Sequence, residues 1–158
     1  MLELQPEHIE SLGMRAVHLL MAFAVLALAA CSKPTPPVGK WEGGTERGGV
    51  LVVARVEILP SGLVRVMAPD ITNAAPEQIP ALRERLAADL VNGWADVAPR
   101  EMDFDGKTFR WPDKIAPQMV WDKNSNQMIL QLYIGANKAL PVPLRPVSEF
   151  HDSPWAAG

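Results

Sequence analysis

Residues 50–67 read VLVVARVEILPSGLVRVM, and this stretch decides the fold class. Apolar residues occupy positions 52, 54, 56 and 58, which share one face of an extended strand, while Arg55 and Glu57 fall on the opposite face. Pro60-Ser61-Gly62 is a turn signal, and a second alternating run follows at residues 63–67. The stretch therefore predicts an antiparallel hairpin with one buried face.

The spacing of apolar residues changes from two to three and four after a loop at residues 68–75. Ile79, Leu82, Leu86, Leu90 and Trp94 follow this helical spacing within residues 76–97. Pro76 and Pro80 lie in the leader or the first turn, where a missing N–H is tolerated, and Pro99 ends the segment. We expect this single helix to pack its apolar stripe across one face of the sheet.

Further strands are predicted after the helix. Residues 102–111 read MDFDGKTFRW, and the Asp105-Gly106 pair at their centre is typical of a tight hairpin turn. A second hairpin is predicted from residues 118–122 and 127–134. Residues 140–147 read LPVPLRPV, and each proline removes a hydrogen-bond donor from the ladder. We therefore expect an edge strand or an extended strap there.

The whole pattern predicts an α+β fold. We expect a mostly antiparallel sheet of about six to seven short strands with one amphipathic helix inserted after the second strand. Of the 158 residues, 48 % are hydrophobic and 21 % are charged, which excludes wholesale disorder. The globular domain is expected at residues 39–150. Near its start, GKWEGG at residues 39–44 is either a core tryptophan beside a flexible turn or, by similarity, the first strand of a lipocalin-like barrel.

The N-terminus carries an apolar run, LLMAFAVLALAA, at residues 19–30. A membrane-spanning helix needs about 20 apolar residues, so this run instead fits the core of a secretory signal peptide. Residues 1–13 contain glutamates and no Lys or Arg, whereas Met14-Arg15 directly precedes the run. We expect residues 14–30 to be the signal peptide and residues 1–13 to be an extension from a misassigned start.

Leu28-Ala29-Ala30-Cys31 resembles the lipobox of bacterial lipoproteins at all four positions. The resemblance implies that Leu28, Ala29 and Ala30 are recognised by a lipoprotein signal peptidase, which cuts before Cys31. It also implies lipid attachment to the Cys31 sulfur, and several acyl chains anchor a protein stably. Residues 31–38 would then be the lipidated cysteine and a proline-rich tether. Ser32, where an Asp favours retention in the inner membrane, suggests the outer membrane.

Little in the sequence indicates catalysis. The net charge of −3 does not point to nucleic acid, and a single cysteine excludes an internal disulfide and a cysteine zinc site. Asp103 and Asp105 could form a carboxylate pair, but a turn explains them more simply. His151 begins a segment, residues 151–158, that we expect to be an exposed flexible tail. Trp155 in it either docks on a partner or is disordered. We expect no catalytic residue, cofactor or metal.

The chain resembles the small lipoproteins of the Gram-negative cell envelope. We therefore predict a membrane-anchored lipoprotein that faces the periplasm and acts as a non-catalytic binding or structural module. Its partners would be the membrane, through Cys31, and an envelope protein or polymer. An alternative is a lipocalin-like carrier of a small hydrophobic ligand. A hydrolase of envelope components, working through Asp103 or Asp105, is the third hypothesis.

Overall fold

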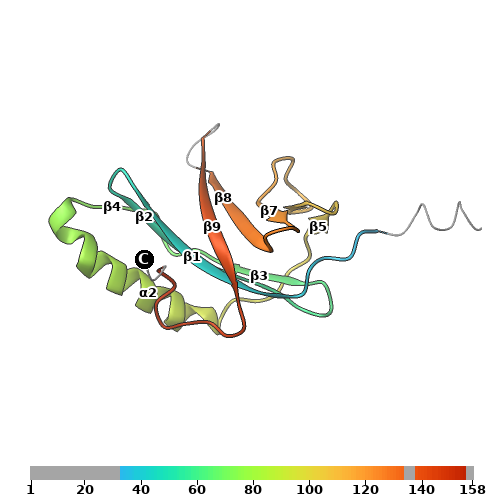
Figure 1. Ribbon diagram of the computed structural model, residues 1–158, viewed down its shortest axis with the longest axis horizontal. Coiled ribbons are helices and arrows are strands. Elements are labelled where there is room, and N and C mark those ends of the chain that lie inside the picture. The colour runs from blue at the N-terminus through green and yellow to red at the C-terminus, as the bar shows by residue number, and fades with distance from the viewer. Residues whose placement is uncertain (1–32, 134–137, 156–158) are drawn as a thin grey trace, which may run out of the picture. The chain divides into compact units, whose positions relative to one another are not determined.

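The computed structural model describes residues 33–133 and 138–155, and one compact unit of the chain begins at Pro34. Figure 1 shows a curled sheet with one long helix along its outer face. The elements are β1 (Gly39–Arg47), β2 (Val50–Ile58), β3 (Val64–Met67), β4 (Thr72–Asn73), the 3₁₀ turn η1 (Pro76–Gln78), α2 (Ile79–Trp94), β5 (Asp103–Phe104), β6 (Thr108–Arg110), β7 (Met119–Asp122), β8 (Gln127–Tyr133) and β9 (Ala139–Val147).

The sheet is antiparallel throughout, with the strand order β3-β2-β1-β9-β8-β7-β6-β5, and β4 pairs with the start of β2. An isolated bridge between Val64 of β3 and Arg100, just before β5, brings the two ends of this order together. The Val64 N–H donates to the Arg100 carbonyl at 2.8 Å, and the Arg100 N–H donates back at 2.9 Å. The sheet is therefore curled into a half-barrel whose concave side forms a core.

The α+β class and the antiparallel sheet are confirmed, but the expected strand count and helix position were wrong. The described residues contain nine strands, and the helix follows the fourth strand instead of the second. The two additional strands are β1 and the two-residue β4. The start of β1 was left open between a flexible turn and a first strand, and β4 was expected to be loop. Glycines persist inside β1 because other chain segments approach them closely. A Cβ on Gly43 would lie 2.4 Å from the Pro143 carbonyl oxygen.

The prediction of an edge strand at residues 140–147 was also wrong, because β9 lies in the middle of the sheet between β1 and β8. Its prolines fit there because β9 never has both neighbours at the same residue. Pro141 and Pro143 pair only with β8, whereas Pro146 pairs only with Trp41 of β1. Each proline therefore lies where one flank of the strand has no ladder to complete.

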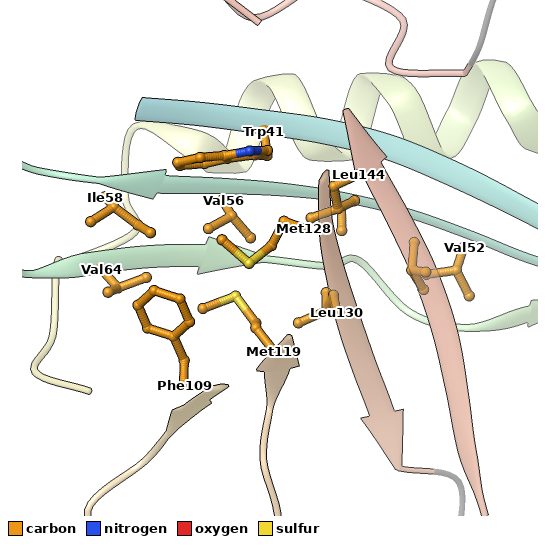
Figure 2. Packing of buried hydrophobic residues seen from close by; sticks show 12 residues of the cluster. Trp41, Val52, Val56, Ile58, Val64, Phe109, Met119, Met128, Leu130 and Leu144 are labelled. Atoms are coloured by element: carbon orange, nitrogen blue, oxygen red, sulfur yellow. The ribbon is translucent and has the colours of Figure 1, made fainter. Parts of the chain in front are cut away.

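Side chains from both halves of the sheet fill its concave side, as Figure 2 shows. The alternation predicted for residues 50–59 is confirmed, because positions 52, 54, 56 and 58 all face this core. Phe109 of β6 is completely buried, and its ring stacks on Phe104 with the centroids 4.4 Å apart. The buried members of this concave core are Trp41, Val52, Ala54, Val56, Ile58, Val64, Phe109, Met119, Met128, Leu130, Val142 and Leu144.

A second, smaller cluster lies on the convex side of β2. Leu51 and Val53 pack there against Leu86 and Leu90 of α2, which confirms that the helix lays its apolar stripe across the sheet. The helix is shorter than the predicted 76–97, since α2 ends at Trp94 and its leader is the 3₁₀ turn η1. Pro80 occupies the first turn as expected.

The tryptophans differ in their burial. Of Trp41, Trp94, Trp111 and Trp121, only Trp41 is fully buried. The other three are half-buried. The guanidinium of Arg65 lies 4.7 Å from the centre of the Trp94 ring. The guanidinium of Arg100 lies 4.6 Å from the centre of the Trp111 ring. These rings lie at the margins of the core, where a cation can cover one aromatic face.

Candidate functional site

A buried cluster of charges lies on the convex side of the sheet around Glu42. Because side chains alternate along a strand, Trp41 enters the concave core and Glu42 faces the opposite way. Its cross-strand partners are both arginines, Arg55 on β2 and Arg145 on β9. Arg55 Nε lies 3.7 Å from Glu42 Oε2, and Arg145 Nη2 lies 3.9 Å from Oε1. The carboxylate is therefore flanked by positive charge on two strands.

The chain after β9 folds back over this cluster and closes it. The His151 N–H donates to Glu42 Oε2 at 3.0 Å, and His151 Nδ1 lies 2.5 Å from Oε1. Arg55 Nη2 donates to the carbonyl oxygen of His151. Glu42 consequently has no solvent exposure, and both of its oxygens are engaged. A buried carboxylate held in this way fixes the C-terminal segment in place.

Arg55 joins the cluster to the end of the helix. Its guanidinium lies 4.9 Å from the centre of the Phe150 ring, which meets Trp94 of α2 edge-on, also with centroids 4.9 Å apart. Burial lowers the pKa of Arg55, while the negative charges of Glu42 and Asp152 oppose that shift. Arg55 Nε is the one buried side-chain N or O atom in the described part of the chain without a hydrogen-bond partner. Glu42 is therefore its main electrostatic compensation.

Trp155 docks the same C-terminal segment on α2. Its Nε1 donates to the carbonyl oxygen of Arg83 at 3.0 Å. The Arg83 guanidinium lies 5.1 Å from the centre of the Trp155 ring and pairs with Glu46 of β1 at 2.5 Å. A Cβ on Gly44 would lie 2.5 Å from Trp155 Cε3, so the missing side chain of Gly44 makes room for the ring. At residues 151–155, the segment that we expected to be a flexible tail is packed against β1 and α2.

A groove of about 600 Å³ lies between α2 and this docked segment. Small and apolar side chains form its floor, among them Ala88 and Val91, and Val91 is 37 % exposed. Glu84 and Asp152 supply acidic groups at its edge. The lining residues are Pro80, Arg83, Glu84, Ala87, Ala88, Val91, Asn92, Asp152, Ser153 and Trp155. We refer to this site as the α2 groove.

The lipobox residues and the aspartates singled out from the sequence lie outside this site. Leu28, Ala29, Ala30 and Cys31 are outside the described residues, as are the expected extension and signal peptide. Asp105 stabilises its turn by accepting hydrogen bonds from the N–H groups of Lys107 and Thr108 and from the Thr108 hydroxyl. These bonds lower the pKa of Asp105 to about 2.

The cluster around Glu42 was missed at the sequence level. His151, expected to be exposed, does keep a side chain that is 60 % exposed, but its Nδ1 and its N–H bind Glu42. The one available signal was the charge of Arg55, on the face of the strand that it shares with Val53 and Glu57. Recognising its partner required the pairing of β1 with β2, and β1 itself was not predicted with certainty.

Within residues 33–133 and 138–155, no three His, Cys, Asp or Glu side chains are grouped to hold a metal ion. No helix in these ranges has the length and apolarity to cross a membrane. Comparison with protein-family models, curated proteins and solved structures finds no match to this chain.

Proposed function

We propose that the chain is a membrane-anchored lipoprotein of the bacterial envelope that acts as a non-catalytic binding module. The α2 groove is its docking site, and the occupant is a segment of an envelope protein. The observation that carries the proposal is the construction of this groove. One wall is a helix packed on the sheet, and the other is held by the buried Glu42 cluster and by Trp155. A site held on rigid elements binds without a large ordering cost.

The lining of the groove favours a particular chemistry in the partner. Ala87, Ala88 and Val91 present small apolar surfaces that allow close approach. Glu84 and Asp152 at the edge attract positive charge, whereas Arg83 is already paired with Glu46. We therefore expect a segment with an apolar stripe flanked by Lys or Arg, which inserts as helices do into apolar grooves.

The packed interior supports surface binding over the carrier alternative. The concave side holds Phe109, Met119 and Met128, each with no solvent exposure. A carrier of the lipocalin type needs an open interior, because small-ligand sites are cavities of about 300–1,000 Å³. The side chains in Figure 2 occupy that space themselves.

The anchor is tested by metabolic labelling with an alkyne fatty acid. Wild type should carry the label and fractionate with membranes, and Cys31→Ala should lose both properties. An unlabelled wild-type protein would contradict the anchor.

The groove is tested by a photo-crosslinking amino acid at Val91 in living cells. We expect a crosslink to one segment that has an apolar stripe and basic flanks, as mapped by mass spectrometry of the crosslinked peptide. Ala88→Arg should abolish the crosslink, since it places a long cation on the groove floor. Ala98→Arg is the matched control, because Ala98 is exposed and outside the groove. No crosslink, or equal loss in both variants, would contradict the docking site.

A further inference from the structure

The proline-rich tether keeps Cys31, the proposed site of lipid attachment, close to the end of the sheet that contains the β5–β6 turn. Pro34 lies beside the β5–β6 turn, because a Cβ on Gly106 would be 3.7 Å from Pro34 Cβ. Pro36 and Pro37 are half-buried on the domain, so residues 34–38 are not a free spacer. Pro34 is three positions after Cys31, and an extended chain spans at most about 3.6 Å per residue. A lipidated Cys31 thus stays within about 11 Å of Pro34.

The strand register places several connections at this same end. β1 begins there with Gly39 opposite Ile58, where β2 ends. The β7–β8 turn also lies there. Asp122 pairs with Gln127 at the start of β8, and the next residue, Met128, pairs with Leu144 near the end of β9. Figure 1 shows the tether leaving at the end where the β2–β3 loop and β5 lie. The loop at residues 68–71, next to the start of β2, is at the opposite end.

A depression of about 400 Å³ lies between the β5–β6 and β7–β8 turns. Lys107, Asp122 and Lys123 line it, together with the half-buried Trp121. Neither lysine forms an ion pair within the described residues. The two nearby carboxylates are engaged in their own turns. Asp105 binds Thr108, and Asp122 accepts from the Asn124 N–H at 3.0 Å and from the Ser125 hydroxyl at 2.7 Å.

We propose that this end of the sheet rests on the membrane, with Lys107 and Lys123 contacting the phosphate groups of anionic lipids. The proposal rests on the anchor at Cys31 proposed above. It follows from the short tether, the two lysines without ion pairs and the aromatic edge beside them, since Trp rings and Lys side chains favour the headgroup region. The opposite end of the sheet then points away from the lipid.

Orientation can be measured on the lipidated full-length protein in vesicles of phosphatidylethanolamine and phosphatidylglycerol. Cys31 is the only cysteine, so an introduced cysteine is the only free thiol once Cys31 carries lipid. Gln127→Cys reports on the proposed membrane end, and Asp70→Cys reports on the opposite end. Both residues are exposed and lie outside the depression. Each is labelled with a fluorophore, and quenching by headgroup spin-labelled lipid is measured.

We expect strong quenching at position 127 and little at position 70. The double variant Lys107→Ala/Lys123→Ala should lower the fraction of molecules quenched at position 127, with about a five-fold shift of the orientation equilibrium for each lysine. Lys114→Ala/Lys138→Ala removes the same charge elsewhere and should leave quenching unchanged. Equal quenching at both positions, or no effect of the Lys107/Lys123 variant, would overturn the proposal. Intact mass checks the lipid on Cys31 beforehand, so that a missing anchor is recognised separately and would overturn both proposals.

Discussion

His151 Nδ1 lies 2.5 Å from Oε1 of Glu42, a residue 109 positions earlier whose side chain has no solvent exposure. This contact closes the C-terminal segment over the junction of β1, β2 and β9. Together with the His151 N–H, which donates to Oε2, it gives the buried carboxylate two hydrogen bonds that its flanking arginines do not supply. The cluster thereby joins the last part of the chain to the first strand, and it holds one wall of the α2 groove.

Replacing Glu42 with Gln should destabilise the fold strongly. The variant leaves the buried Arg55 without its counter-charge, and breaking a buried pair by removing one partner typically costs about 3–5 kcal/mol. Urea unfolding of the purified protein measures the loss. Glu46→Gln is the control, since its pair with Arg83 is partly exposed and is worth at most about 1 kcal/mol. Similar losses in both variants would show that burial of Glu42 is not what matters.

Gly44→Ala should displace Trp155 from α2, because the added Cβ would lie 2.5 Å from the indole ring. The released C-terminal segment should then be trimmed by carboxypeptidase faster than in wild type, as followed by intact mass. Gly48→Ala is the comparison. Its Cβ would have no atom within 4 Å, although its φ of +60° imposes some backbone strain. Faster trimming in both variants would point to general destabilisation and against a specific contact.

Truncation of Phe109 should open a cavity in the concave core. The ring is completely buried and stacked on Phe104, so Phe109→Ala should cost about 3–5 kcal/mol of unfolding free energy. Tyr133→Ala removes a side chain from a residue that is 41 % exposed, and we expect a clearly smaller loss. Equal unfolding midpoints for Phe109→Ala and wild type would contradict the packing shown in Figure 2.

Acid should weaken the β5–β6 turn only when the pH falls below the ordinary pKa of an aspartate carboxyl. The pKa of Asp105 is lowered to about 2 from 3.8, so its contribution to stability is present above 3.8. That contribution disappears as the pH falls toward about 2. Asp105→Asn should therefore be less stable than wild type at neutral pH, and the difference should shrink over this interval. Urea unfolding at several pH values tests this, with Asp103→Asn as the exposed control. A difference that is independent of pH would be the contrary result.

The parts of the fold that the sequence predicted are those with local causes. The Asp105-Gly106 turn fixes a hairpin through neighbouring residues, and the spacing of Leu86 and Leu90 fixes the helix face. β9 could not be placed in this way. Its prolines indicate only that ladder donors are missing, and whether that makes an edge depends on where β1 and β8 begin and end. The glycines of β1 likewise have their explanation in Pro143 and Trp155, far along the chain.

The candidate site was harder still to predict. Its residues lie far apart in the sequence, and no short motif joins them. They are Glu42 of β1, Arg55 of β2, Arg145 of β9 and His151 in the segment after β9. Alternation placed Arg55 on the convex face correctly. The alternation could not show the pairing of β1 with β2, which places the Glu42 carboxylate opposite Arg55.

The placement of β9 also governs the order in which the chain can mature. β9 is the last strand to be synthesised, yet it is the strand that joins β1 to β8. Until it emerges, β1–β3 and β5–β8 are connected only through the Val64–Arg100 bridge, and the edges of β1 and β8 that β9 will cover have unsatisfied backbone groups. Such edges invite pairing with other chains. Assembly of the half-barrel therefore waits for β9, and a nascent chain lacking it exposes two strand edges that favour aggregation.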